Sequence, residues 1–310
     1  MIEVQNITKH FQNFTALENV SCSIDSGCIY GMVGSNGAGK STLLRVLAGV
    51  YQADSGSVLV DGQPVWDNPN VKKQIAYVPD ELYFLSGNLN RMKQMHLALY
   101  NDFDSSRFDT LCKKLELPQN KSIGQFSKGM HRQAATILTL SRRPNYLLFD
   151  ETFDGLDPVM RQFVKSLICD DVLERGATAI ITSHSLRELE DLCNQLALLH
   201  KGGLVLESDI ENLKTSQFKI QIAFSSPFDK EKFSGIKIVH FEKSGSVANL
   251  IVNGDRQEIV EKLRAMSPIL LDVLPLTLEE VFTYKMEALG YSFGELDTEQ
   301  KEEKPDENKR

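Results

Sequence analysis

A glycine-rich segment near the start of the chain constrains its fold more than any other feature. The residues Gly34-Ser35-Asn36-Gly37-Ala38-Gly39-Lys40-Ser41-Thr42 fit the phosphate-binding loop pattern, two glycines around four residues and then Lys-Ser. The apolar residues 28–33 before it predict a buried strand, and residues 40–48 predict a helix. The glycines let backbone N–H groups turn into one concavity, and the helix N-terminus adds its dipole. We therefore expect Lys40 to reach terminal phosphates and Ser41 to bind the accompanying Mg²⁺.

The composition excludes several other classes. With 310 residues, 42% of them hydrophobic, the chain can bury a large core in one or two domains. A net charge of −8 argues against broad binding to nucleic acid or anionic lipid, so we expect no nucleic-acid partner. No apolar run reaches the length of a membrane span, and the N-terminus lacks a secretory signal pattern. The five scattered cysteines predict reduced thiols rather than disulfides or a zinc site.

Strands alternate with helices along residues 1 to about 215, which is the pattern of a mainly parallel sheet covered on both faces. Strands at 2–8 and 17–24, with residues 10–14 as a loop between them, predict an antiparallel edge region. Residues 56–65 predict two further strands around an Asp-Gly turn. Later strands are expected at 75–79, 146–150, 178–182, 196–200 and 204–206, and helices at 126–140, 158–174 and 185–194.

Residues 81–125 are helix-rich, and with the following helix they predict a helical insertion at about 81–140. Apolar residues recur there at helical spacing, and such a stripe is more often core than partner surface: Met92, Met95, Leu97, Leu99, Phe108, Leu111 and Leu115.

A different pattern begins near residue 216. Strands at 218–224, 236–241, 247–252 and 269–274, with helices at 255–266 and from Thr277 onward, predict a small α/β accessory domain at 216–292. Thr277 and Glu280 form a capping-box pattern, followed by the apolar face Leu278, Val281, Phe282, Met286 and Leu289. Such a domain could assist dimerisation or regulation, or could only stabilise the subunit. Residues 293–310 are acidic and predict a disordered tail.

Two acids follow the apolar strand that ends at Phe149. Asp150 would hold the Mg²⁺ shell, and Glu151 would orient or deprotonate an attacking water. Taken alone, such a pair could equally be solvated acids at a strand end. Three more segments accompany it, however: Phe126-Ser127-Lys128-Gly129-Met130, Asp154-Gly155-Leu156-Asp157-Pro158 and Ile181-Thr182-Ser183-His184.

This ordered set of motifs resembles the ATP-binding cassette (ABC) ATPases over residues 1 to about 210. The resemblance implies an α/β P-loop NTPase fold with a mainly parallel core sheet, an antiparallel β subdomain and a helical insertion. It implies ATP and Mg²⁺ as cofactors, with Lys40, Glu151 and His184 as catalytic residues. It also implies metal ligands and nucleotide contacts beyond the loop: Phe11 on the adenine, Asp80 and Asp150 at the metal with Ser41, and Ser127, Gly129 and Asp157 at the nucleotide.

The sequence departs from the family pattern at several positions. Asp80 replaces the usual glutamine, Thr152 the usual proline, and Phe126, Lys128 and Met130 replace three signature residues. Ser127 and Gly129, which the family uses to touch the γ-phosphate from the opposing subunit, are retained. Asp80 could still bind Mg²⁺, but it brings negative charge toward the triphosphate.

The Ser-Lys-Gly-Met signature resembles a subgroup of bacterial exporter ATPases of the drug, peptide and antibiotic-resistance type. This implies a subunit that powers a separate transmembrane permease, pairs with a second ABC subunit, and lies on the cytoplasmic face of the membrane through that permease alone. Two alternatives stay open: a soluble non-transport ABC ATPase, and a regulatory module that uses ATP only to dimerise. A GTPase is disfavoured because the nearest base-reading string, starting at Asn120, lacks its acid.

Overall fold

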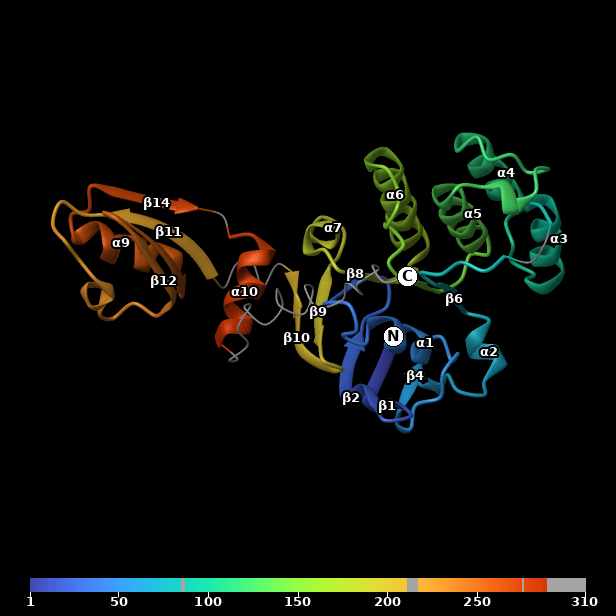
Figure 1. The fold of residues 1–310 in the computed structure, drawn as a ribbon, viewed down its shortest axis with the longest axis horizontal. Coiled ribbons are helices and arrows are strands. Elements are labelled where there is room, and N and C mark those ends of the chain that lie inside the picture. Colours follow the sequence, from blue (N-terminus) through green and yellow to red (C-terminus); the bar gives the residue numbers. More distant parts are fainter. Residues whose placement is uncertain (85–86, 211–216, 275, 289–310) are drawn as a thin grey trace, which may run out of the picture. The chain divides into compact units, whose positions relative to one another are not determined.

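The computed structural model describes residues 1–84, 87–210, 217–274 and 276–288 (Figure 1). The chain divides into two compact units, Met1–Asp209 and Ile210–Arg310. The predicted boundary between residues 215 and 216 lies outside the described residues and stays a prediction. So do the predicted tail at 293–310, residue Leu289 and the side chain of Met286.

A six-stranded sheet forms the centre of the first unit, in the order β10-β9-β3-β8-β7-β6. Its members are β3 (Ile29–Val33), β6 (Ile75–Val78), β7 (Tyr146–Phe149), β8 (Thr178–Ser183), β9 (Gln195–His200) and β10 (Gly203–Asp209). Only the edge pair β9–β10 is antiparallel. Every residue of β3, β7 and β8 is buried, which explains why these strands appear in the sequence as apolar runs without alternation. The predicted parallel core sheet is confirmed.

A second sheet of the first unit is antiparallel, in the order β2-β1-β4-β5. It consists of β1 (Ile2–Phe11), β2 (Phe14–Ile24), β4 (Ser55–Val60) and β5 (Gln63–Pro64). The expectation of a loop at residues 10–14 is wrong. β1 continues to Phe11, which pairs with Phe14 across a two-residue turn where Gln12 has a φ of 51°. A tight turn of this kind needs only two residues, so the aromatic residues remain in the strands.

The described residues of the first unit also form seven α-helices: α1 (Lys40–Leu47), α2 (Pro69–Lys72), α3 (Leu89–Leu99), α4 (Ser105–Lys114), α5 (Lys128–Ser141), α6 (Pro158–Arg175) and α7 (Leu186–Glu190). A short 3-10 helix spans Ile123–Gln125. The side chains of Asn88, Asp104, Ser127 and Asp157 cap α3 to α6. In Figure 1 the insertion helices α3, α4 and α5 gather beyond β6.

Helix α7 is shorter than the predicted 185–194. Asn194 exchanges two hydrogen bonds with Ile29: its backbone N–H donates to the Ile29 carbonyl, and its side-chain oxygen accepts from the Ile29 N–H. This pairing ties the chain to the start of β3, so the helix ends early and β9 begins.

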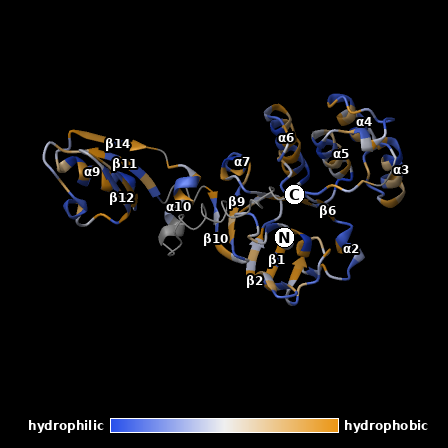
Figure 2. Cartoon of the chain, in the orientation of Figure 1, coloured by the Kyte–Doolittle hydropathy of each residue, from blue (hydrophilic) through white to orange (hydrophobic). Residues whose placement is uncertain are grey.

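The apolar stripe of the insertion is only partly core. Met92, Phe108 and Leu111 are buried, but Met95, Leu97 and Leu99 are exposed, Leu99 by 63%. The helical period was correct, and the assignment of the whole stripe to the core was wrong. Figure 2 shows mixed hydrophilic and hydrophobic colouring along α4, α5 and α6, as expected for helices with one packed face.

The second unit contains one antiparallel sheet, in the order β12-β13-β11-β14. Its elements are β11 (Gln217–Ala223), a 3-10 helix (Lys230–Phe233), β12 (Ile238–Ser244), β13 (Val247–Asn253), α9 (Arg256–Ala265), β14 (Leu270–Leu274) and α10 (Leu278–Ala288). The predicted capping box is present, since the Glu280 N–H donates to Thr277 Oγ1 at 3.2 Å and the Thr277 N–H donates to Glu280 Oε2 at 3.1 Å. No helix among the described residues is both long and apolar enough to cross a membrane.

Candidate functional site

The glycine-rich loop joins β3 to α1 in the conformation that its glycines permit. Gly37 and Gly39 have φ angles of 79° and 103°, which other residues adopt only with strain. A Cβ at Gly34 would lie 2.4 Å from the Leu199 carbonyl oxygen, and one at Gly39 would lie 2.6 Å from that of Ala16. Ser35, Asn36 and Gly37 form the exposed tip. The loop therefore offers backbone to solvent at its tip and packs tightly at both ends.

Lys40 lies under this loop. Its side chain is 5% exposed, and Nζ donates to the carbonyl oxygens of Gly34 (2.7 Å) and Ser35 (3.2 Å). Nζ also lies 3.2 Å from Glu151 Oε1. A buried ammonium requires such oxygens around it, and phosphate oxygens of the same geometry could replace them.

Asp150 ends β7 and is fully buried. Its Oδ1 accepts from Ser41 Oγ (3.0 Å) and Thr182 Oγ1 (2.8 Å), and its Oδ2 accepts from the Tyr77 hydroxyl (3.1 Å). Burial, together with the charge of Asp150, raises the pKa of Tyr77, so the phenol stays a donor. Ser41 and Asp150 present adjacent oxygen atoms beside the loop, which fits the oxygen ligands that Mg²⁺ takes.

Glu151 follows Asp150 at a φ of 47° and is 12% exposed as a side chain. Its N–H donates to Thr182 Oγ1 at 3.0 Å. Its Oε2 lies 3.2 Å from His184 Nδ1, which is also 4.0 Å from Asp154 Oδ1. The carboxylate thus lies between the amine of Lys40 and the half-exposed ring of His184, where a base or a water-orienting group would be useful.

The turn that carries His184 is fixed by side-chain contacts that the sequence did not reveal. Ser183 Oγ donates to Glu188 Oε2 at 2.6 Å and accepts from the Ser185 N–H at 3.0 Å. Glu188 in turn pairs with Arg161 Nη1 at 2.9 Å. Thr182 and Tyr77 were also missed, since hydroxyl residues inside strands carry no local signal of a contact with a distant acid.

The remaining predicted residues lie apart from this cluster. Ser127 is exposed and caps α5, and Asp157 is exposed and caps α6 through a 3.0 Å hydrogen bond from the Met160 N–H. Phe11 is 39% exposed, with its ring edge-on to Tyr51 at 5.3 Å. Within the described part of the chain, Ser127, Gly129, Asp157 and Phe11 make no hydrogen bond to Lys40, Asp150 or Glu151.

Asp80 forms an ion pair with Arg132 of α5. No hydrogen bond joins its carboxylate to Ser41 or Asp150 within the described residues, and its predicted role at the metal stays a prediction.

Comparison with known proteins identifies the class. The family model described as ABC transporter matches residues 17–154. The ABC transporter ATP-binding protein YtrB of Bacillus subtilis is 32% identical over 92% of this chain and 98% of its own length. The lantibiotic transport ATP-binding protein SrtF of Streptococcus pyogenes is 30% identical over 72% of this chain and 98% of its own length.

Among solved structures, the dimeric post-hydrolysis state of the cassette MJ0796 bound to ADP and Pi has a TM-score of 0.61, with 22% identity over 68% of this chain and 99% of that one. That likeness concerns the fold. The chain belongs to the ATP-binding subunits of ABC transporters. It is therefore an ABC ATPase, whose hydrolysis of ATP is coupled to transport, and its P-loop NTPase fold is confirmed.

Proposed function

We propose that this chain binds MgATP on the β3–α1 loop, hydrolyses it within a dimer, and powers export through a separate permease. One observation carries the proposal: Lys40, the pair Asp150 and Glu151, and His184, from three separate segments, converge in one hydrogen-bonded cluster at the carboxyl edge of the parallel sheet. Ligands of α/β proteins bind at that edge. A module that only dimerised on ATP would not need a carboxylate held beside the loop lysine.

Each residue of the cluster then has a role. Lys40 exchanges the carbonyls of Gly34 and Ser35 for phosphate oxygens. Ser41 and Asp150 would hold Mg²⁺, which supplies charge neutralisation on the phosphates. Glu151 orients a water and accepts its proton, and His184 contacts the γ-phosphate. Phe11, exposed at the hairpin end, stacks on the adenine.

The exposed residues Ser127 and Asp157 and the partly exposed Gly129 support a dimer. They lie on the surface and are not hydrogen-bonded to the cluster of their own chain among the described residues, so a second copy or a homologous subunit would bring them to the nucleotide. Closing the site between two chains also excludes water from the reacting phosphate.

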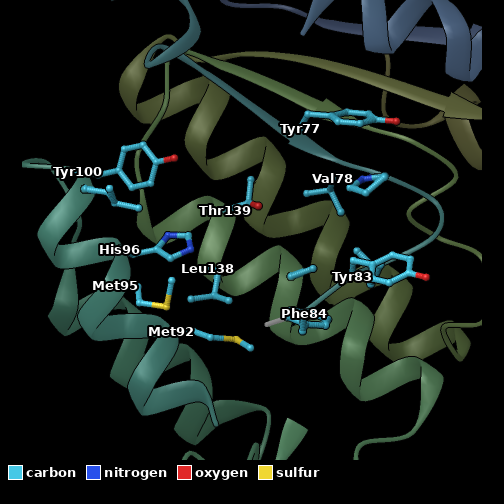
Figure 3. Close-up of a pocket in the computed structure, with 14 residues that line it drawn as sticks. Tyr77, Val78, Tyr83, Phe84, Met92, Met95, His96, Tyr100, Leu138 and Thr139 are labelled. Carbon is cyan, nitrogen blue, oxygen red and sulfur yellow. The ribbon is translucent and has the colours of Figure 1, made fainter. Parts of the chain in front are cut away.

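A surface pocket in the insertion supports contact with a permease (Figure 3). It has a volume of about 350 Å³ and is lined mainly by apolar and aromatic side chains of the β6 end, α3 and α5, among them Tyr83, Met92, Met95, Leu99 and Leu138. Tyr83 is 95% exposed at its edge. Exposed apolar surface of this kind is typical of a partner site. We assign it to a short cytoplasmic helix or loop of the permease, which would be the only link to the membrane.

His96 places one polar side chain in this mainly apolar pocket. Burial, together with the charge of Arg142, lowers the pKa of His96, and its buried Nδ1 has no hydrogen-bond partner among the residues that the structure describes. Figure 3 shows the His96 ring among the side chains that line the pocket, which include Met95 and Leu138. The permease segment would therefore insert an apolar side chain into the pocket. It would also carry one polar group that forms a hydrogen bond with the neutral imidazole of His96.

Co-purification with candidate permeases encoded near its gene tests the proposal. We expect the chain to remain with one such membrane protein in detergent, and Met95→Arg to lose it while Lys237→Glu, an exposed change in the second unit, does not. Inside-out vesicles carrying the pair test direction, because ATP added outside should drive accumulation of a labelled lantibiotic within them. Loss of lumenal peptide on adding ATP would instead indicate import.

A further inference from the structure

Arg132 carries a charge in the interior of the first unit. It is 1% exposed and is the largest of the fully buried side chains described. A guanidinium stays protonated, so its burial is tolerated only with an anion and acceptors around it. Among the described residues, the polar partners of its guanidinium come from one short segment: the Asp80 carboxylate, in an ion pair, and the Pro79 carbonyl oxygen, 3.4 Å from Nη1.

That segment leaves the sheet beside the candidate site. It follows β6, which pairs in parallel with β7 so that Val78 lies opposite Phe149. The Asp150 N–H donates to the Val78 carbonyl oxygen at 2.9 Å. Asp80 therefore emerges at the same edge as Asp150 and Glu151, and a bound triphosphate would add more negative charge there.

The other end of the ion pair belongs to the helix that begins after Ser127. Arg132 stands about one and a half turns into α5, and α5 also packs on β6. An α-helix is a stiff element, so a shift of α5 would carry Ser127, Gly129 and the Arg132 guanidinium together. A shift of α5 must either break the ion pair or move the end of β6.

We propose that the Asp80–Arg132 ion pair is a mechanical link, called the strut below, between the sheet edge and α5. Through it, a nucleotide bound at the sheet edge would influence the position of Ser127 and Gly129. In this role Arg132 is a positioning residue, and it also makes an acid at position 80 compatible with a triphosphate. Without Arg132, Asp80 repels the nucleotide. Without Asp80, Arg132 is buried without its anion, and α5 loses its ion pair to the segment that follows β6. The inference rests on the proposed ATP-dependent dimer.

A double-mutant cycle tests the strut. The three variants are Asp80→Asn, Arg132→Met and the double variant. In the wild-type chain they are used to measure KM and kcat. In the Glu151→Gln chain they are used to measure the MgATP concentration at half-maximal dimerisation. We expect each single change to raise that concentration and KM roughly tenfold, and the double variant to return toward wild type, because contacting partners are not additive and the double variant leaves neither a repelling carboxylate nor an unpaired buried cation. Asp80→Glu, which keeps the charge, should lie closer to wild type than Asp80→Asn in the MgATP concentration at half-maximal dimerisation, and it keeps the test usable if Asp80→Asn folds poorly.

Arg107→Met is the matched control. Arg107 of α4 pairs with buried Asp171 of α6 at 2.5 Å, in the same unit but on other elements. We expect it to lower the unfolding temperature as Arg132→Met does, while KM and the dimerisation midpoint stay unchanged. Additive single effects, or an equal shift from Arg107→Met, would overturn the strut alone. A wild-type chain that neither hydrolyses ATP nor dimerises would overturn the proposed function as well.

Discussion

The two units of this chain bury different kinds of side chain. Among the described residues, the first unit buries Lys40, Arg132, Thr136, Ser141, Asp150, Thr152, Asp171, Thr178, Thr182 and Ser183 as well as its apolar core, whereas the second buries one polar residue, Gln217. The second unit has a core of Phe, Ile, Leu and Val side chains. Buried polar groups cost free energy unless they are paired, so a protein retains them where they do chemistry or fix geometry. The difference assigns the chemistry to the first unit and leaves hydrophobic packing as the main stabiliser of the second.

The largest expected effect comes from Glu151→Gln. The amide keeps the shape of the side chain but cannot accept the proton of water, so we expect kcat to fall about 10³-fold while ATP still binds. Steady-state phosphate release and equilibrium binding of a fluorescent ATP analogue measure the two quantities. Hydrolysis near the wild-type rate would remove Glu151 from its assigned role.

Asp150→Asn should have the next largest effect. Asp150 accepts hydrogen bonds from Ser41, Thr182 and Tyr77, and an amide would turn an N–H group toward at least one of these donors. We expect a loss of about 10²-fold in kcat/KM, with a Mg²⁺ requirement shifted to higher concentration. Titration of the rate with Mg²⁺ at fixed ATP measures both. An unchanged Mg²⁺ midpoint would argue against Asp150 at the metal.

A core truncation in the second unit should separate stability from chemistry. Leu250 is fully buried in β13, and Leu250→Ala should destabilise this unit by about 2–5 kcal/mol. Denaturant unfolding followed by a probe in each unit would detect this loss. ATP hydrolysis per folded molecule should stay at the wild-type value. A parallel fall in kcat would mean that the second unit takes part in the reaction cycle.

The smallest effect concerns the ion pair between Lys219 and Glu280, whose charged atoms lie 2.7 Å apart. Burial raises the pKa of Glu280, but hydrogen bonds from Lys219 and Thr277 outweigh it and lower the pKa below its usual value. A lowered folded pKa gives stability that is present at neutral pH and is lost as pH falls through that pKa. We expect Glu280→Gln to cost up to about 1 kcal/mol of unfolding free energy at pH 7, and progressively less as the pH falls through the lowered pKa of Glu280. A pH-independent difference would exclude this origin.

Much of the candidate site could be predicted because its signals are local. The loop glycines, Lys40, Ser41 and the two acids after β7 stand in short segments whose flanking strand or helix identifies them. The partners that hold them could not be predicted in this way. Thr182, Tyr77 and Arg132 contact acids 32, 73 and 52 positions away, and such pairings depend on sheet order and helix packing rather than on periodicity.

The errors in the fold have a similar cause. Periodicity located the helix that carries Met95 and Leu99, but it could not tell a core-facing residue from one on an open pocket, because both are apolar at the same spacing. The strand extension to Phe11 was missed because a two-residue turn leaves almost no polar interval in the sequence.

In the proposed dimer, each ATP site combines the β3–α1 loop of one chain with Ser127 and Gly129 of the other chain. Crosslinking between these two places tests this shared site. Asn36→Cys and Ser127→Cys are exposed positions, introduced into separate, differently tagged Glu151→Gln chains. Burial raises the pKa of the native thiols Cys22, Cys28, Cys112 and Cys193, which limits their reaction; chains without added cysteine serve as the control. A short bis-maleimide should link the two chains only when MgATP is present. No link with MgATP, or an equal link without it, would contradict the shared site.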